Sequence, residues 1–144
     1  MIGIRQLLVA SGVATAAELY GLSAQEIEAL EAKIGLVFPG VYREFLSVAG
    51  RSAGRFASEV DVFFPDVVEL QGEAKELIAE CKPGYQLPDD ALIFTGYQGY
   101  QYTFFRCLGD DPPVYRFFDD DEEPTQTADS LSAFLREMVA TTPR

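Results

Sequence analysis

Residues 23–50 read SAQEIEALEAKIGLVFPGVYREFLSVAG, and they predict two helices joined by a short turn. Ser23 and Glu26 have the capping-box spacing, in which the hydroxyl and the carboxylate each satisfy a free backbone amide of the first turn. Gly35 supplies the left-handed conformation that ends a helix, so the first helix is expected over residues 24–34. Apolar residues recur within it at spacings of three and four, on one face: Ile27, Leu30 and Ile34.

The second helix of this segment is expected to begin at Pro39 and to continue to Ala49, before Gly50. Proline is favoured at the start of a helix, because the first-turn amide that it lacks would have no partner there. The apolar stripe of this helix comprises Val41, Tyr42, Phe45 and Leu46. Nearer the amino terminus, residues 3–10 have a weaker helical pattern, and its extension to Tyr20 stays open.

A third helix is expected after a short predicted strand, Val60–Phe64. Asp66 is the expected N-cap of this helix, because its carboxylate can accept a hydrogen bond from a first-turn amide. The apolar residues that follow have the register of a half-buried helix: Val67, Leu70, Ala74, Leu77, Ile78 and Cys81.

The period changes from helical to extended after residue 91. Three segments rich in aromatic and β-branched residues predict strands: Leu92–Thr95, Tyr100–Cys107 and Val114–Phe118. Their short, glycine-containing connections predict an antiparallel meander. A closing helix is expected to open at Asp129 or Ser130. Helices, then strands, then a helix indicate an α+β fold, with amino-terminal helices packed on the meander.

The compartment is predicted from cysteine usage and hydropathy. Cys81 and Cys107 have apolar neighbours and are expected to be buried free thiols, which is typical of a reducing compartment. The apolar run Leu7–Ala10 is short and is preceded by Arg5 alone, so it is a poor signal peptide. No stretch approaches the roughly 20 apolar residues that span a bilayer. We therefore expect a cytoplasmic protein.

The formal net charge of −12 is distributed unevenly along the chain. Residues 1–58 contain five basic and five acidic residues, so the whole imbalance lies in residues 59–144. The electrostatic field of this negative charge repels nucleic-acid phosphates and anionic lipid headgroups, and it speeds the encounter with a basic partner. The charge makes nucleic acid and membranes unlikely ligands and suits a basic protein partner. Composition alone favours the alternative, in which the acidity serves only solubility.

Catalytic and metal-binding signals are missing from the sequence. Histidine is absent, which removes the commonest general base, the usual partner of a serine or cysteine nucleophile, and the commonest metal ligand. The phosphate-binding and nucleophile-elbow glycine motifs are absent too. Among 23 Asp and Glu residues some pair will lie close by chance, so carboxylates alone do not indicate a glycosidase. We expect no catalytic residue, no cofactor and no metal.

The candidate partner-binding residues lie in the segment 110–123, which contains seven acidic residues and only one basic residue, Arg116. They are Asp110, Asp111, Asp119, Asp120, Asp121, Glu122 and Glu123. The run Asp119–Glu123 lacks the alternating spacing of an EF-hand loop, so a solvated turn between a strand and a helix is expected rather than a calcium site. The intervening strand separates the two acidic groups, so they need not form one patch.

Tyr97 is added to the candidate surface, because tyrosine is a common anchor of protein interfaces. Tyr100 and Tyr102 lie close to it in the sequence. Alternate residues of a strand normally face a core, so the pattern favours core packing of these tyrosines over a place in an interface.

Three sequence motifs resemble those of a known family. The first is residues 27–46, where a helix leads into F-P-x-x-Y-x-x-F-L. The second is residues 87–105, and the third is the closing D-S-L-x-x-F-L at 129–135. Together they resemble the SUKH superfamily, which includes the fungal Smi/Knr regulators of cell-wall synthesis and many bacterial immunity proteins of polymorphic toxin systems. Phe38 departs from the leucine that is usual in the family.

The resemblance implies a single SUKH-like domain over residues 1–144 that binds protein and performs no catalysis. In bacteria it implies neutralisation of a secreted toxin, often a nuclease with a basic active-site face. We therefore expect an immunity protein that occludes a basic-faced toxin domain through its acidic carboxy-terminal half. A regulatory or scaffolding adaptor of the Smi/Knr kind is the alternative, and the oligomeric state stays open.

Overall fold

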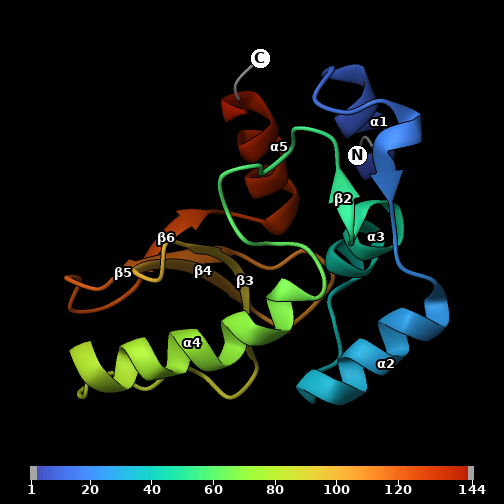
Figure 1. The fold of residues 1–144 in the computed structure, drawn as a ribbon. Helices are drawn as coiled ribbons and strands as arrows, with labels where there is room; N and C mark the ends of the chain where they lie inside the picture. The colour runs from blue at the N-terminus through green and yellow to red at the C-terminus, as the bar shows by residue number, and fades with distance from the viewer. Residues whose placement is uncertain (1–2, 143–144) are drawn as a thin grey trace.

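The computed structural model describes residues 3–142, which are largely helical up to residue 81 and largely extended from 91 to 128 (Figure 1). The α-helices are α1 (Ile4–Ala10), α2 (Ala24–Ile34), α3 (Gly40–Ala49), α4 (Asp66–Cys81) and α5 (Leu131–Thr141), and a 3₁₀ helix covers Ala16–Glu18. The strands are β1 (Leu19–Tyr20), β2 (Ser52–Ala53), β3 (Ala91–Tyr97), β4 (Gln101–Arg106), β5 (Val114–Phe118) and β6 (Thr125–Ala128).

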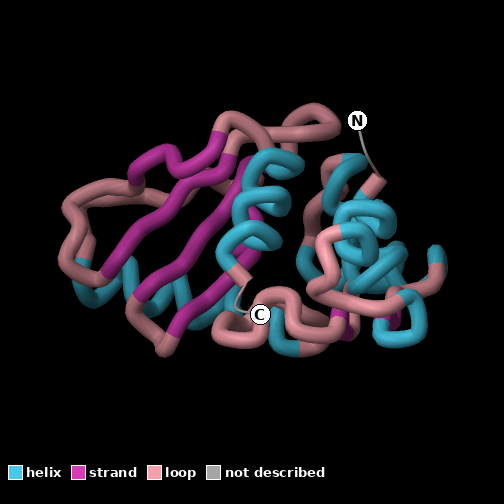
Figure 2. The backbone as a smooth tube through the Cα atoms, turned by 90° about the horizontal axis from the view of Figure 1, so that it is seen from above, coloured by secondary structure: helices cyan, strands magenta, loops and turns pink. Residues whose placement is uncertain are grey.

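The main sheet is an antiparallel meander in the order β3-β4-β5-β6. Helix α5 lies across one face of this sheet and α4 across the other, with α1, α2 and α3 grouped at its side (Figures 1 and 2). Strands β1 and β2 pair within that helical group. The predicted α+β fold, with amino-terminal helices, a meander and a closing helix, is confirmed.

Helix α2 has the ends that its sequence predicts. The Ser23 hydroxyl accepts a hydrogen bond from the Glu26 amide at 3.1 Å, and the Glu26 carboxylate accepts one from the Ser23 amide at 2.9 Å. Gly35 ends the helix with φ at 85°, a conformation that favours glycine. Both helix boundaries are therefore set by local contacts.

Replacing Ser23 with alanine is expected to lower the free energy of unfolding by about 1 kcal/mol, because the Glu26 amide loses its acceptor. Chemical denaturation of the wild type and the variant measures the difference. Ser47 is an exposed serine within α3 and serves as the control, since Ser47→Ala should change stability by less than about 0.5 kcal/mol. Equal stability of the Ser23 variant and the wild type would show that the cap contributes nothing.

Helix α3 supplies the centre of the core. Its predicted apolar stripe is buried, and the helix begins at Gly40 with Pro39 as its N-cap residue, one position after the predicted start. The buried stripe contains Val41, Tyr42, Phe45 and Leu46. This core lies against the face of the sheet that α5 covers. A second apolar cluster lies between the opposite face and α4, so the sheet is buried on both faces near its centre.

Tyr42 is fully buried among the rings of Phe38, Phe94 and Phe105, and its hydroxyl has no hydrogen-bond partner within residues 3–142. Burial in this apolar environment raises the pKa of the phenol. An unpaired buried hydroxyl costs about 1–3 kcal/mol. We expect Tyr42→Phe to raise the free energy of unfolding by about 1 kcal/mol, measured as a higher urea midpoint with an unchanged slope. A lower midpoint would mean that a partner such as a buried water satisfies the hydroxyl.

The predicted strand Val60–Phe64 is wrong. Asp61 forms only one isolated bridge, with its amide 2.8 Å from the Gly96 carbonyl oxygen, and Val62 is buried in the core. The Gln71 side chain also bonds the Ile93 amide and carbonyl, at 2.9 and 2.8 Å. These contacts occupy much of the outer edge of β3.

The predicted N-cap of α4 is also wrong. Pro65 occupies that position and Asp66 is the first helical residue, where its charge still favours the positive end of the helix dipole. Cys81 and Cys107 are free, as expected, but Cys81 is exposed because the buried stripe of α4 ends at Ile78. Cys107 is half-buried, and burial raises the pKa of its thiol to about 11.

Strands β3, β4 and β5 confirm the three predicted strands to within two residues at each end. Strand β6 was not predicted, because Thr125–Ala128 has no alternation of apolar and polar residues and forms by pairing with β5. Asp119–Glu123 is consequently the turn of a hairpin between β5 and β6, and the predicted turn between a strand and a helix is wrong.

Candidate functional site

The predicted acidic residues lie at the two ends of β5. Asp110 and Asp111 precede this strand, and Asp119–Glu123 follow it. A strand of 5 residues spans about 17 Å, so the two groups are well separated. The structure therefore places them at opposite ends of the sheet, as the sequence allowed.

Asp111 has a structural role at the start of α5. Its carboxylate accepts hydrogen bonds from the Ser132 amide at 2.8 Å and from the Ser132 hydroxyl at 2.5 Å. Asp110 is exposed, and its carbonyl oxygen accepts a hydrogen bond from the Val41 amide at 2.9 Å, near the start of α3. The loop between β4 and β5 is thus fastened to two helices, and the Asp111 carboxylate is already engaged within the protein.

We call Asp119, Asp120, Asp121, Glu122 and Glu123 the acidic hairpin. Asp119, Asp120, Glu122 and Glu123 are exposed. Asp121 instead points inward, because its carboxylate accepts a hydrogen bond from the Phe118 amide at 3.0 Å. The Asp121 carbonyl oxygen also accepts a hydrogen bond from Lys82, a buried lysine that directly follows α4. The turn is therefore held in place by one carboxylate and one lysine, and the other carboxylates project into solvent.

Tyr97 lies at the same end of the sheet as the acidic hairpin. The Asp119 amide donates to the Tyr100 carbonyl oxygen at 2.9 Å, which joins the hairpin to the turn between β3 and β4. The Tyr97 and Tyr100 rings meet edge to face, with centroids 5.6 Å apart. Tyr97 is half-buried and Tyr100 is 37% exposed, whereas Tyr102 is buried in the core at 2%. Of the three tyrosines, only Tyr102 is therefore packed in the core, and Tyr97 and Tyr100 are at least partly exposed.

Helix α4 adds an acidic stripe that the sequence interpretation missed. Its exposed acidic residues are Asp66, Glu69, Glu73, Glu76 and Glu80. The last four recur at spacings of three and four, which places them on one face, opposite the buried stripe. This spacing was the signal available in the sequence.

The carboxy-terminal end of α4 lies against the acidic hairpin (Figure 1). Cys81, Lys82 and Tyr85 line a shallow hollow with the hairpin residues. Burial, followed by the negative charge of Glu123, raises the pKa of the Tyr85 phenol. The hairpin, the end of α4 and Tyr97 therefore lie at one end of the molecule, and this end is strongly acidic.

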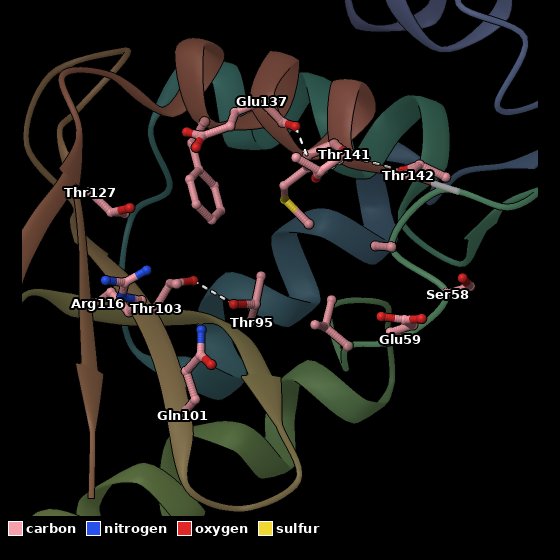
Figure 3. A pocket seen from close by; sticks show the side chains of 14 residues that line it. Ser58, Glu59, Thr95, Gln101, Thr103, Arg116, Thr127, Glu137, Thr141 and Thr142 are labelled. Atoms are coloured by element: carbon pink, nitrogen blue, oxygen red, sulfur yellow. Dashed lines mark hydrogen bonds between the residues drawn. The ribbon is translucent and has the colours of Figure 1, made fainter. Parts of the chain in front are cut away.

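A pocket of about 250 Å³ lies between α5, the sheet and the loop 57–60 (Figure 3). We call it the Arg116 pocket. Its lining includes Arg116, Gln101, Thr103, Thr127, Phe134 and Met138. The Arg116 guanidinium lies over the Phe118 ring, 4.9 Å from its centroid. In the sequence Arg116 stands out only as the one cation of the acidic segment, because nothing in its neighbours indicates that β4, β6 and α5 converge on it.

Metal-binding groups and membrane-spanning helices are both absent from the described part of the chain. Among residues 3–142, no group of three or more Asp, Glu and Cys side chains could hold a metal ion. No helix in that range is long and apolar enough to cross a membrane. What the arrangement provides is exposed carboxylates and partly exposed tyrosines at one end of a rigid sheet, which suit the recognition of a basic surface.

The fold and this surface define the class of the protein, a small α+β domain with one strongly acidic end. A family model described as the SMI1 / KNR4 family (SUKH-1) matches residues 21–137. The match covers more than half of the chain, so the chain belongs to this family and the resemblance seen in its motifs is confirmed. Members are in general non-catalytic immunity or regulatory domains. No curated protein sequence matches the chain.

Proposed function

We propose that this chain is a cytoplasmic immunity protein that binds a basic-faced toxin domain and occludes its active site. A nuclease is one class of toxin that presents such a face. The observation that carries the proposal is the acidic hairpin, where four exposed carboxylates project from a turn that Asp121 and Lys82 hold in place.

Charge and geometry support the proposal in different ways. Exposed like charges grouped at one end of a protein attract an oppositely charged partner and raise the rate of encounter. Tyr97 and Tyr100 lie beside the hairpin and offer apolar contact area at a low cost in side-chain entropy. Because the hairpin is fixed to both the sheet and α4, little conformational freedom is lost on binding.

A regulatory adaptor is the second candidate, and the name of the matching family favours it, since the family includes the Smi/Knr regulators. An adaptor would use the same acidic end to hold a protein of cell-wall synthesis or signalling. The two functions differ in the gene neighbourhood, because an immunity gene is expected directly after the gene of its toxin.

Co-expression tests the proposal. The carboxy-terminal domain encoded by the gene directly upstream is induced in bacterial cells with and without this chain. We expect the domain alone to arrest growth and the chain to restore it, with the two proteins purifying as one complex. If the upstream domain does not arrest growth but still binds the chain, the adaptor function is favoured. Growth arrest that the chain does not relieve would contradict immunity against that domain.

A further inference from the structure

Arg116 forms no ion pair and no hydrogen bond with any of residues 3–142, although the segment around it is the most acidic of the chain. Each of the arginines 43, 51 and 106 instead pairs with a carboxylate. Arg116 is half-buried and its guanidinium faces the pocket beside Thr103 (Figure 3). Its N–H donors are therefore available to an acceptor from outside the chain.

Neighbouring side chains in the Arg116 pocket also have donors to spare. The Thr95 and Thr103 hydroxyl oxygens lie 2.6 Å apart, so one hydroxyl donates to the other and the second proton has no acceptor among residues 3–142. The side-chain amide of Gln101 and the side-chain hydroxyl of Thr127 likewise have no hydrogen-bond partner in that range. Arg116 and these neutral donors all lie on the strands that form one wall of the pocket, and a cation beside neutral donors suits an anion.

The surroundings narrow the class of anion. Glu59 and Glu137 stand at the pocket and, with the net charge of −12, oppose a multiply charged group such as a phosphate. Phe134 and Met138 form an apolar wall that would pack against the carbon chain of the ligand. The volume of about 250 Å³ lies below the roughly 300–1,000 Å³ of sites for drug-sized ligands, so one amino-acid side chain or one chain end would fill the pocket.

We infer that the Arg116 pocket binds a single carboxylate of a polypeptide, with the guanidinium and the Thr95–Thr103 pair donating to its two oxygens. The carboxylate comes from an acidic side chain or from a chain terminus, and its source as a partner protein rests on the proposed function. Gln101 pairs with Phe118, the residue that directly precedes the acidic hairpin. A partner held at the hairpin would therefore reach the pocket. The hairpin would attract basic groups of the partner and Arg116 would attract an acidic group, and this second contact fixes the orientation of the partner.

Nuclear magnetic resonance titration of the isotopically labelled chain tests this inference without the partner. The probes are acetyl-alanyl-leucine, which has a terminal carboxylate, and acetyl-glutamate amide, which has a side-chain carboxylate, each compared with its uncharged amide analogue. We expect saturable shifts at Gln101, Thr103, Arg116 and Thr127 with a carboxylate probe and none with its analogue. The carboxylate probe that binds with the higher affinity shows whether the pocket prefers a chain terminus or an acidic side chain.

Substitutions at Arg116 complete the test. Arg116→Gln should weaken probe binding at least about ten-fold, because charge-assisted hydrogen bonds are lost, and Arg116→Lys should weaken it less. Arg136 is an exposed arginine of α5 outside the pocket lining, so Arg136→Gln should leave probe binding unchanged. The inference is overturned if no carboxylate probe binds saturably, if the amide analogues bind equally well, or if both glutamine variants weaken binding alike. None of these results would bear on binding at the acidic hairpin.

Discussion

Replacing Phe45 with alanine is expected to lower the free energy of unfolding by about 3–5 kcal/mol. Phe45 is fully buried in α3, and its ring packs against Phe94 at 5.6 Å and Phe56 at 6.1 Å between centroids. These neighbours belong to the sheet and to the loop after β2, so the cavity left by alanine would open where separate parts of the fold meet. Small domains have about 5–15 kcal/mol of stability, so this loss is a large fraction of the total.

Urea or guanidinium denaturation measures this loss as a lower midpoint with an unchanged slope. Val37 is an apolar residue that is 79% exposed, so Val37→Ala is the control and should change stability by less than about 0.5 kcal/mol. A loss below about 1 kcal/mol for the Phe45 variant would contradict the packing described for α3.

Reversing the exposed charges of the acidic hairpin is expected to slow association with the partner about ten-fold or more at low salt. The variant replaces Asp119, Asp120 and Glu122 with lysine and keeps Asp121, whose carboxylate holds the turn. Exposed charges steer encounter and contribute less once the complex has formed, so dissociation should change less than association. The wild-type association rate should also fall with added salt, since charges are screened beyond about 8 Å at physiological ionic strength.

A matched control variant distinguishes the effect of the hairpin charges on the association rate from the effect of the total charge. Glu28, Glu69 and Asp89 are exposed and lie outside the acidic hairpin, and their replacement by lysine changes the net charge by the same amount. Stopped-flow or surface-based kinetics compares both variants with the wild type at low and high salt. If both variants slow association equally, only the total charge matters, and if neither does, the hairpin serves solubility and the partner binds elsewhere.

The elements that could be predicted from the sequence are those whose signals are local. Helix α2 has its capping box, its apolar face and its stop glycine within residues 23–35, and no distant contact is needed to set its ends. Helix α5 likewise has Ser130 as its N-cap, and the Ser130 hydroxyl accepts a hydrogen bond from the Ala133 amide. Strands β3, β4 and β5 are dense in aromatic and β-branched residues and are joined by short turns, so the meander could be predicted too.

The elements that were missed depend on contacts between distant residues. Strand β6 is polar and exposed, and only its pairing with β5 makes it a strand. Residues 60–64 have a strand-like composition, but Val62 is buried within the helical core and Asp61 pairs with Gly96 alone. Composition indicates which residues are buried more reliably than it indicates the backbone conformation that buries them.

The candidate site could be predicted only in part for the same reason. The run Asp119–Glu123 was visible as a charged turn, but the inward position of Asp121 depends on Phe118 and Lys82. The carboxylate of Asp111 is engaged by a helix that begins 20 residues later. Such side-chain partners are fixed by the tertiary structure and leave no spacing pattern in the sequence.

Titration of the purified toxin's activity with the purified chain measures whether this chain binds a toxin domain and blocks it. Increasing amounts of chain are added to a fixed amount of toxin, and the residual activity is measured. If the chain is an immunity protein, we expect a steep loss of toxin activity that ends at a fixed molar ratio, and a shift of that curve to higher concentrations for the hairpin variant. Full toxin activity at a large excess of the wild-type chain would contradict this function.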